Sequence, residues 1–256
     1  MGDRTQLATP LVGLSLMPQA DFFQAAEPLL ASGAVDVLEW SFDMGWGAVT
    51  LPDWVPEILA HYSQRDRLLG HGVSYSLLSA QRDSSHWLAC LQAECQQYRY
   101  RQISEHFGWM AAGDFYQSAP LPLPLRPETL QLGQQRLQSL AATAQVPVGL
   151  ENLAFAFGLP DVLEQGTFLD QLLEPVDGFL LLDLHNLYCQ MHNFRQSAVE
   201  LLARYPLNRV RELHLSGGSW TEHSEGRIRR DTHDHPVPEP VFELLAIALQ
   251  QCPQVE

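Results

Sequence analysis

Several features that would fix the class of a protein are missing from this chain. No stretch of its 256 residues approaches the ~20 consecutive apolar residues of a membrane-spanning helix, so we expect no membrane partner. The first ten residues, MGDRTQLATP, lack the apolar centre of a secretory signal, which predicts a cytoplasmic protein. Lysine is absent altogether.

The chain also contains few cysteines and lacks two common functional motifs. Its four cysteines show neither CxxC spacing nor a disulfide framework; they are Cys90, Cys95, Cys189 and Cys252. We expect buried free thiols, as in a reducing compartment. Glycine-rich phosphate loops and the GxSxG elbow are absent as well, which argues against nucleotide binding and serine-hydrolase chemistry.

Positive charge is scarce. Fifteen arginines oppose 30 acidic residues, giving a formal net charge of −15. Such a surface repels a phosphate backbone unless a local basic patch intervenes. The cluster Arg227, Arg229 and Arg230 is too small for a nucleic-acid track, although it could hold one anionic group of a substrate. We therefore expect no nucleic-acid partner.

What the sequence does contain is an alternation of short apolar runs with longer amphipathic segments. The runs are rich in Leu, Val and Phe, as expected for strands buried on both faces. They are Leu11–Met17, Val35–Phe42, Leu68–Tyr75, Gln102–Trp109, Val146–Phe155, Gly178–Tyr188 and Val210–Leu215. Helical patterns between and after them include Asp21–Ser32, Ser85–Tyr98, Pro127–Ala144, Phe194–Tyr205 and Val241–Gln250.

This order predicts a single domain, residues 1–256, folded as an α/β protein of the (β/α)8 TIM-barrel type. Strand starts recur roughly every 24 to 45 residues, the length of one βα unit. The last residues, Cys252–Glu256, would begin an eighth strand, which we expect to be incomplete. The Pro-rich stretch Ala119–Pro127 is expected to be a loop over the barrel mouth.

Ionisable and amide side chains gather where the apolar runs end. They are His71, His106, Glu151 with Asn152, Asp183 with His185 and Asn186, and His214, followed in a loop by Asp231 and His233. In a barrel, the C-terminal ends of parallel strands share one mouth. Polar groups at the close of apolar strands are costly to bury unless they are paired or bound to metal. The pattern therefore predicts a metal centre at that mouth.

The donor types narrow the choice of metal. Imidazole with carboxylate suits iron, zinc or manganese, and this many ligands fits two or three ions bridged by a carboxylate better than one tetrahedral ion. Asp231 and His233 would point to the same side of an extended loop. His185 and Asn186 compete for one position. Glu39 ends the second run and is either a supporting or substrate-binding group or half of a structural ion pair.

The remaining histidines have less specific settings. His61, His86 and His192 fall in helical or loop segments and are expected to be solvated. His223 and His235 flank the expected centre as ligands or substrate contacts.

These motifs, taken together, resemble the DUF692 family of multinuclear non-haem iron-dependent oxidative enzymes. The matching segments follow the family's order from about Val12 onward: VDVLEW, HGVSYSL, SEHFGWM, LPLPL, VGLENLAF, LLDLHNLYCQMHN, ELHLSG and DTHDHPV. The resemblance implies a xylose-isomerase-like TIM barrel, two or three iron ions, and oxygen-dependent remodelling of cysteine in ribosomally made peptides. It also implies a cysteine-containing precursor peptide and a separate leader-recognition protein as partners.

The resemblance assigns roles residue by residue. The implied metal ligands are His71, His106, Glu151, Asp183, Asn186, His214, Asp231 and His233, with Glu151 as the bridge. Glu151, Asp231 and His233 are the implied catalytic residues, and Glu39, Asn152 and His185 are expected to bind substrate. Asn186 offers only a neutral amide, so the ion it holds should be labile. Most relatives have asparagine where this chain has His185, which leaves the role of His185 open.

Other functions compete with this one. A zinc or manganese hydrolase or phosphodiesterase, or a sugar isomerase, would use a similar barrel, and a barrel without catalysis could serve as a binding partner. The acidic surface counts against DNA, the absence of lysine counts against a sugar isomerase, and the full set of donors at the strand ends counts against a non-catalytic barrel.

Overall fold

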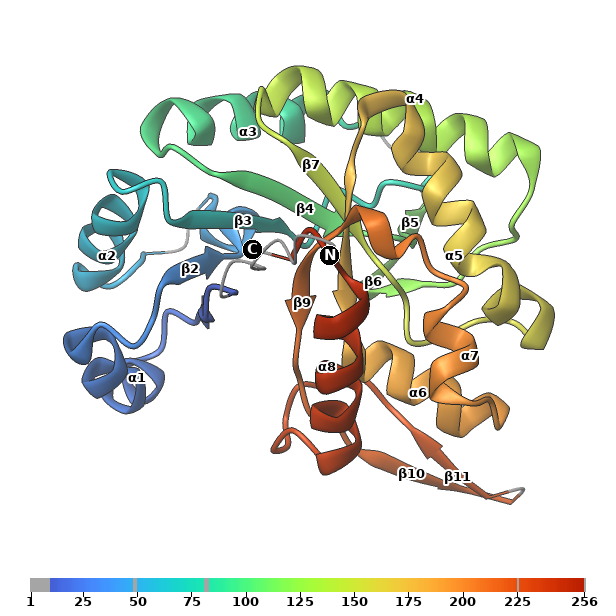
Figure 1. The fold of residues 1–256 in the computed structure, drawn as a ribbon. Helices are drawn as coiled ribbons and strands as arrows, with labels where there is room; N and C mark the ends of the chain where they lie inside the picture. The colour runs from blue at the N-terminus through green and yellow to red at the C-terminus, as the bar shows by residue number, and fades with distance from the viewer. Residues whose placement is uncertain (1–9, 48–49, 81–82, 225, 256) are drawn as a thin grey trace, which may run out of the picture.

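The computed structural model describes residues 10–47, 50–80, 83–224 and 226–255. A curled parallel sheet lies at the centre of these residues, and helices cover its outer face (Figure 1). Its strands, in spatial order, are β1 (Gly13–Leu16), β2 (Val37–Trp40), β3 (Leu68–Gly72), β4 (Gln102–His106), β7 (Val148–Glu151), β8 (Phe179–Asp183) and β9 (Val210–His214).

Helices connect successive strands of this sheet. The α-helices are α1 (Ala20–Ser32), α2 (Trp54–Ser63), α3 (Ser85–Gln97), α4 (Pro127–Ala144), α5 (Leu159–Leu173), α6 (Leu184–Phe194), α7 (Ala198–Leu202) and α8 (Glu239–Gln251). Short 3-10 turns are η1 (Phe42–Gly45), η2 (Glu174–Val176) and η3 (Leu207–Arg209). Each strand is thus followed by a crossover segment, which is what parallel pairing requires.

The seven apolar runs each contain one strand of the sheet, so the prediction of seven βα units is confirmed. Strand β8 shows the reason: Phe179–Leu182 is a continuous apolar segment that is buried on both faces. The strand predicted over Gly178–Tyr188 is shorter in the structure. It stops at Asp183, whose carboxylate accepts the backbone N–H of Asn186 and thereby caps α6.

The expected helices are confirmed for α1, α3, α4 and α8. The expectation of one helix over Phe194–Tyr205 is wrong. Helix α6 already occupies the chain up to Phe194, and Arg195 takes a left-handed conformation with φ 52° that ends it. The short α7 then begins at Ala198.

Two antiparallel hairpins were not predicted from the sequence. Strands β5 (Trp109–Ala112) and β6 (Phe115–Leu121) follow β4, and β10 (Trp220–His223) and β11 (Gly226–Arg229) follow β9. Strand β6 therefore takes up the first part of the Pro-rich stretch that was expected to be a loop. Both hairpins leave from C-terminal ends of sheet strands, where the functional loops of barrels lie.

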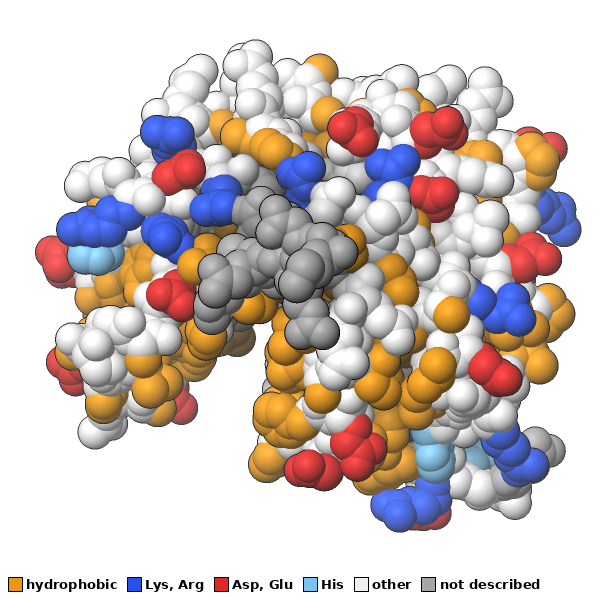
Figure 2. All heavy atoms as spheres, in the orientation of Figure 1, with side chains coloured by type: hydrophobic (Ala, Val, Ile, Leu, Met, Phe, Trp, Pro, Cys, Tyr) orange, Lys and Arg blue, Asp and Glu red, His pale blue; other side chains and the backbone are white. Residues whose placement is uncertain are grey.

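The sheet is open between β1 and β9, because no described strand pairs with their outer edges. Residues 252–255 form a turn after α8, so the expected eighth strand does not begin there, and Glu256 lies outside the described residues. Figure 2 shows a hollow between α1 and α8 bordered by hydrophobic side chains. The exposed apolar residues of these helices include Leu29 of α1 and Phe242 and Leu249 of α8.

The structure bears on two predictions made from composition, one about membrane-spanning helices and one about the cysteines. Among the described helices, none combines the length and apolar character that crossing a membrane demands. All four cysteines are free thiols, as expected, but burial differs between them: Cys189 and Cys252 are buried, whereas Cys90 and Cys95 are half-buried.

Candidate metal centre

Five of the eight expected ligands lie at the C-terminal ends of five strands of the sheet. His106, Glu151, Asp183 and His214 are the last residues of β4, β7, β8 and β9, and His71 is next to last in β3. In-register parallel pairing keeps these ends level, with His106 opposite Glu151 and Asp183 opposite His214. The predicted convergence at one mouth is therefore present.

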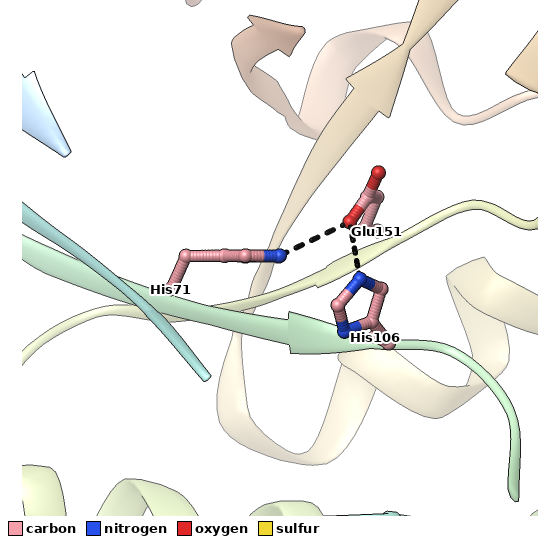
Figure 3. A group of neighbouring side chains, drawn as sticks. All are labelled: His71, His106 and Glu151. Atoms are coloured by element: carbon pink, nitrogen blue, oxygen red, sulfur yellow. Dashed lines mark ion pairs between the residues drawn. The ribbon is translucent and has the colours of Figure 1, made fainter. Parts of the chain in front are cut away.

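His71, His106 and Glu151 form one group of possible metal donors (Figure 3). The Nε2 atoms of both histidines lie 3.3 Å from the same carboxylate oxygen, Oε2 of Glu151. The two imidazole rings are 4.6 Å apart between centroids. The donors of the three residues lie within 4.8 Å of one another, so one cation could bind all three.

Glu151 belongs to a second group as well. Donor atoms of Glu151, Asp183 and His214 also lie within 4.8 Å of one another. One carboxylate thus reaches both groups, which is the geometry of a bridging ligand between ions.

A third group was only partly foreseen. Glu39 was expected at the mouth, and its Oε2 lies 2.7 Å from Nε2 of His214. Glu212 joins the pair, with Oε1 3.6 Å from the same nitrogen, and the three donors again lie within 4.8 Å of one another. Glu212 was missed, although its position two residues before His214 on one strand was a usable signal.

Neighbouring polar groups fix the orientation of these ligands. Oγ of Ser104 contacts Nδ1 of His71 at 2.8 Å, which leaves Nε2 to face Glu151. Asn152 accepts the N–H of Asp183 at 2.7 Å and donates to its carbonyl at 3.2 Å. Both ends of that amide are occupied and the residue is buried. Asn152 thus holds the end of β8 in place, and its expected substrate contact stays a prediction.

Asn186 lies against the shared carboxylate. Its Nδ2 donates to the carbonyl of Asn152 at 2.9 Å and approaches Oε1 of Glu151 at 3.4 Å. This places the amide where the sequence predicted a weak ligand.

Asp231 and His233 lie next to each other, outside the three groups. Oδ1 of Asp231 is 3.0 Å from Nε2 of His233 and 3.1 Å from Nδ1 of His185. Nε of Arg229 donates to Nε2 of His185 at 3.0 Å. Both nitrogens of the buried His185 ring therefore have partners within the protein, and its expected substrate contact stays a prediction. The contact of Arg229 with His185 was not predicted from the sequence.

Buried atoms without a hydrogen-bond partner mark the same place. Four of the six such side-chain atoms among the described residues belong to expected ligands: Nδ1 of His106, Oε2 of Glu151, Oδ2 of Asp183 and Oδ1 of Asn186. Buried polar atoms in folded proteins nearly always have partners. The residues therefore fit a metal-ion cluster, which would satisfy oxygen and nitrogen donors that hydrogen bonds leave open.

The histidines expected to be solvated or flanking lie away from these groups. His61, His86 and His192 are exposed. His223 is also exposed, and His235 pairs with the exposed Asp234 at 2.7 Å. Neither flanking histidine contacts an expected ligand.

Comparison with known families decides where the chain belongs. The profile described as "RiPP precursor modification enzyme MbnB/TglH/ChrH" matches residues 46–256. The chain belongs to this family. The DUF692 resemblance drawn from the sequence motifs is thereby confirmed.

Curated relatives of this family are described as UPF0276 proteins. One from Pseudomonas aeruginosa is 32% identical over 73% of this chain and 64% of its own length. One from Rhizorhabdus wittichii is 30% identical over 93% and 82%, and one from Streptomyces avermitilis is 28% identical over 76% and 41%. The chain thus spans less than half of the Streptomyces relative.

Solved structures confirm the fold predicted for this RiPP-modification family member. An L-ribulose 3-epimerase superposes with TM-score 0.55 at 13% identity, covering 95% of this chain and 79% of that chain. A probable 3-DHS dehydratase from Bacillus anthracis gives 0.54 at 14%, covering 94% and 89%. These likenesses establish a xylose-isomerase-like TIM-barrel fold and nothing about the reaction.

Contact between Glu39 and His214 shifts the pKa values of these two residues in opposite directions. Burial disfavours charge on Glu39, but the charge and hydrogen bond of His214 outweigh it and hold the pKa of Glu39 well below its usual range. Against the opposing effect of burial, Glu39 and Glu212 raise the pKa of His214 well above its usual range. Without metal, Glu39 and His214 therefore form a buried ion pair.

Among the other donors, the pKa is raised for Asp183 and His233 and lowered for His106. Burial, followed by the negative charges of Glu151 and Asp231, raises the pKa of Asp183 to about 7. Burial lowers the pKa of His106 to about 4, so its ring is neutral and able to bind a metal near pH 7. The hydrogen bond to Asp231 raises the pKa of His233 to about 9.

A cavity of about 630 Å³ opens inside the curled sheet beside these groups. His71, His106, Glu151, His214 and His233 line it at the donor end. Elsewhere apolar side chains from β1, β3, β9 and α8, among them Leu14, Leu69, Leu213 and Leu245, line it together with polar residues such as Arg101 and Glu212. The space is of the size of a small-molecule or side-chain pocket.

Proposed function

We propose that this chain is a multinuclear iron-dependent, oxygen-using oxidoreductase that modifies cysteine residues of a ribosomally made peptide. One observation carries the proposal: Glu151 is shared by two groups of metal donors. A shared carboxylate is the mark of a multinuclear centre, and the chain belongs to a family described by RiPP precursor modification.

The proposed ligands fall into three positions. His71 and His106 share Glu151 on one side, and Asp183 and His214 share it on the other. The ligands proposed for a third, more labile position are Asn186, Asp231 and His233. Iron held by such nitrogen and oxygen donors would supply redox chemistry and an open position for a soft thiolate ligand. Zinc and manganese suit the same donors.

The chain's own residues orient the proposed ligands and set their protonation before a metal ion binds. Ser104 holds the His71 ring so that Nε2 faces Glu151, and the neutral His106 needs no deprotonation before it binds. His233 keeps a proton at its contact with Asp231 in the metal-free protein, because that pairing raises its pKa to about 9. We assign the catalytic roles to Glu151, Asp231 and His233.

The cavity supports a peptide side chain as the substrate. Apolar side chains from β1, β3 and β9 offer contacts to a group that reaches the donors. A cysteine side chain is short and apolar up to its sulfur, so it suits such a pocket. Glu39 lines the same space and pairs with His214. The precursor peptide and a separate leader-recognition protein remain the proposed partners.

Metal content is the first test. Protein prepared without oxygen and given ferrous iron should bind more than one iron per chain by elemental analysis, because two donor groups meet at Glu151. A single zinc with no uptake of iron would overturn the oxidoreductase proposal and favour a hydrolase.

The reaction is the second test. With ferrous iron, oxygen and its leader-binding partner, the protein should change the mass of a cognate cysteine-containing peptide and leave the Cys→Ser peptide unchanged. A cysteine thiolate is a soft ligand that can bind the iron, whereas a serine hydroxyl is too hard and too weakly acidic to do so. Oxygen uptake measured alongside must accompany the mass change. Neither uptake nor mass change with the cognate peptide would contradict the proposal.

A further inference from the structure

Arg229 is an unusual residue for its place, because it is a buried arginine beside the metal centre. Only 4% of its surface is exposed. Its guanidinium lies over the rings of Trp220 and Tyr188, at 5.1 and 5.5 Å from their centroids. Asn193 on α6 accepts the backbone N–H of Arg229 at 2.8 Å and donates to its carbonyl at 2.9 Å. Asn193 therefore fixes the backbone of Arg229, while the two aromatic rings pack against its guanidinium.

The hydrogen bond from Arg229 determines the tautomer of His185. Arginine carries only donors, so Nε2 of His185, 3.0 Å from Nε of Arg229, must accept and carries no proton. The ring proton of a neutral imidazole then sits on Nδ1. That nitrogen lies 3.1 Å from Oδ1 of Asp231 and donates to it.

The environment of His185 leaves little room for another arrangement. A Cβ atom added at Gly218 would lie 2.6 Å from Cε1 of His185 and 2.0 Å from the carbonyl oxygen of Arg230. The glycine thus lets the base of the β10–β11 hairpin pack directly against the imidazole. Sγ of Cys189 is 4.0 Å from Nδ1, a longer contact than that with Asp231.

Asp231 receives two contacts on one oxygen. His185 and His233 both meet Oδ1, at 3.1 and 3.0 Å, and neither contact uses Oδ2. A carboxylate held in this way is oriented by one oxygen and has the other available as a ligand atom.

We propose that Arg229 and His185 are positioning residues that act in series: Arg229 fixes the tautomer of His185, and His185 holds Oδ1 of Asp231. The β10–β11 hairpin thereby sets the geometry of the Asp231 donor. The inference rests on the proposed metal centre, and it gives His185 a role as neither ligand nor substrate contact. The exposed Arg227 on the same hairpin, paired with Glu222 at 3.0 Å, has no such role.

The tautomer provides a test that does not depend on metal or activity. Long-range ¹H–¹⁵N spectra of the metal-free full chain, with the His185 signals assigned from their loss in His185→Asn, should show protonated Nδ1 and unprotonated Nε2. Arg229→Met should shift His185 toward the other tautomer, and the matched control Arg227→Met should leave it unchanged. Protonated Nε2 in the parent protein, or no change in Arg229→Met, would overturn the proposal.

Iron binding provides the second readout. Arg229→Met and His185→Phe should weaken the most weakly held iron by about 10- to 100-fold, the usual effect of removing such a supporting group. Iron held through the shared Glu151 should remain. Arg229→Gln keeps an N–H that can donate to His185 and should restore binding, and it also serves if Arg229→Met does not fold.

The outcomes separate this inference from the proposed function. If the parent protein takes up no iron, the proposed function fails, while the spectra still decide the tautomer. If the parent binds iron and all variants bind it equally, Arg229 and His185 do not position Asp231.

Discussion

At the scale of single residues, Glu151 is the carboxylate that two groups of described donors share, as His214 is the histidine that two groups share. Glu151→Ala should therefore remove the ions of both groups, since each loses a negative charge and a ligand. Asn186→Ala should lose only the most labile ion, because a neutral amide oxygen contributes little. Elemental analysis of iron per chain is the measurement.

The control for this comparison is His61→Ala, an exposed residue of α2 outside every donor group. It should bind iron like the parent. Equal iron loss in Glu151→Ala and Asn186→Ala would show that Glu151 is not a bridge.

The raised pKa of Asp183 lets us predict how metal binding depends on pH. Its carboxylate must lose a proton to bind a cation, and burial raises its pKa to about 7. His214, whose pKa is raised well above its usual range, must also lose a proton. Protonation thus competes with metal as pH falls, so affinity should decline as pH falls through about 9, where the proposed ligand His233 gains a proton, and again through about 7, where Asp183 does, with protons released on binding. Calorimetry in two buffers would measure both; affinity that is flat across this range would contradict the prediction.

Which site residues could be predicted depends on what the strand pattern contains. Donors at the C-terminal ends of parallel strands gather at one mouth, so the sequence pattern could place His71, His106 and Glu151 near one another. The pattern does not say which side chains meet. Whether Asn152 and His185 face the cavity or a neighbour is decided by contacts with Asp183 and Arg229, which lie far away in the chain.

At the scale of elements, the predictable parts were those with strong periodicity. The sheet strands are uninterrupted apolar segments, and α4 begins with Pro127 at its first position, a clear helix start. The hairpins lack such signals. Strands β10 and β11 read WTEH and GRIR, with little apolar alternation, and β5–β6 contains an irregular register between Trp109 and Ala111.

The packing of α5 against the segment after α7 gives a prediction about stability. A Cβ at Gly166 would lie 2.3 Å from the carbonyl oxygen of Arg204 and 2.8 Å from Cα of Tyr205. Backbone atoms cannot move aside as a side-chain end can, so Gly166→Ala should destabilise the fold by about 1–3 kcal/mol. Denaturant unfolding would show a lower midpoint.

Two other glycines serve as controls. At Gly133 the obstacles are the flexible ends of Leu172 and Leu78, so an alanine there should cost less. At Gly158 the nearest atom is 3.6 Å away, and an alanine should be nearly neutral. Equal effects at Gly166 and Gly158 would mean that α5 does not pack as closely as described.

At the scale of the whole molecule, the order of βα units led to the barrel fold, because each parallel pairing needs a crossover. The closure of the sheet could not be derived in the same way. Seven apolar runs fix seven strands, but whether β1 and β9 meet depends on tilt and spacing around the barrel. In the structure they do not pair.

This open edge divides the backbone amides into two populations. Strands β4, β7 and β8 pair on both sides, whereas β1 and β9 each pair on one side within the described residues. Successive N–H groups of a strand point in opposite directions, so every second amide of β1 and β9 faces the opening. Hydrogen–deuterium exchange should therefore be fast at alternate positions of Gly13–Leu16 and Val210–His214 and slow throughout Phe179–Leu182. Slow exchange at every position of β1 and β9 would reveal that another strand pairs there.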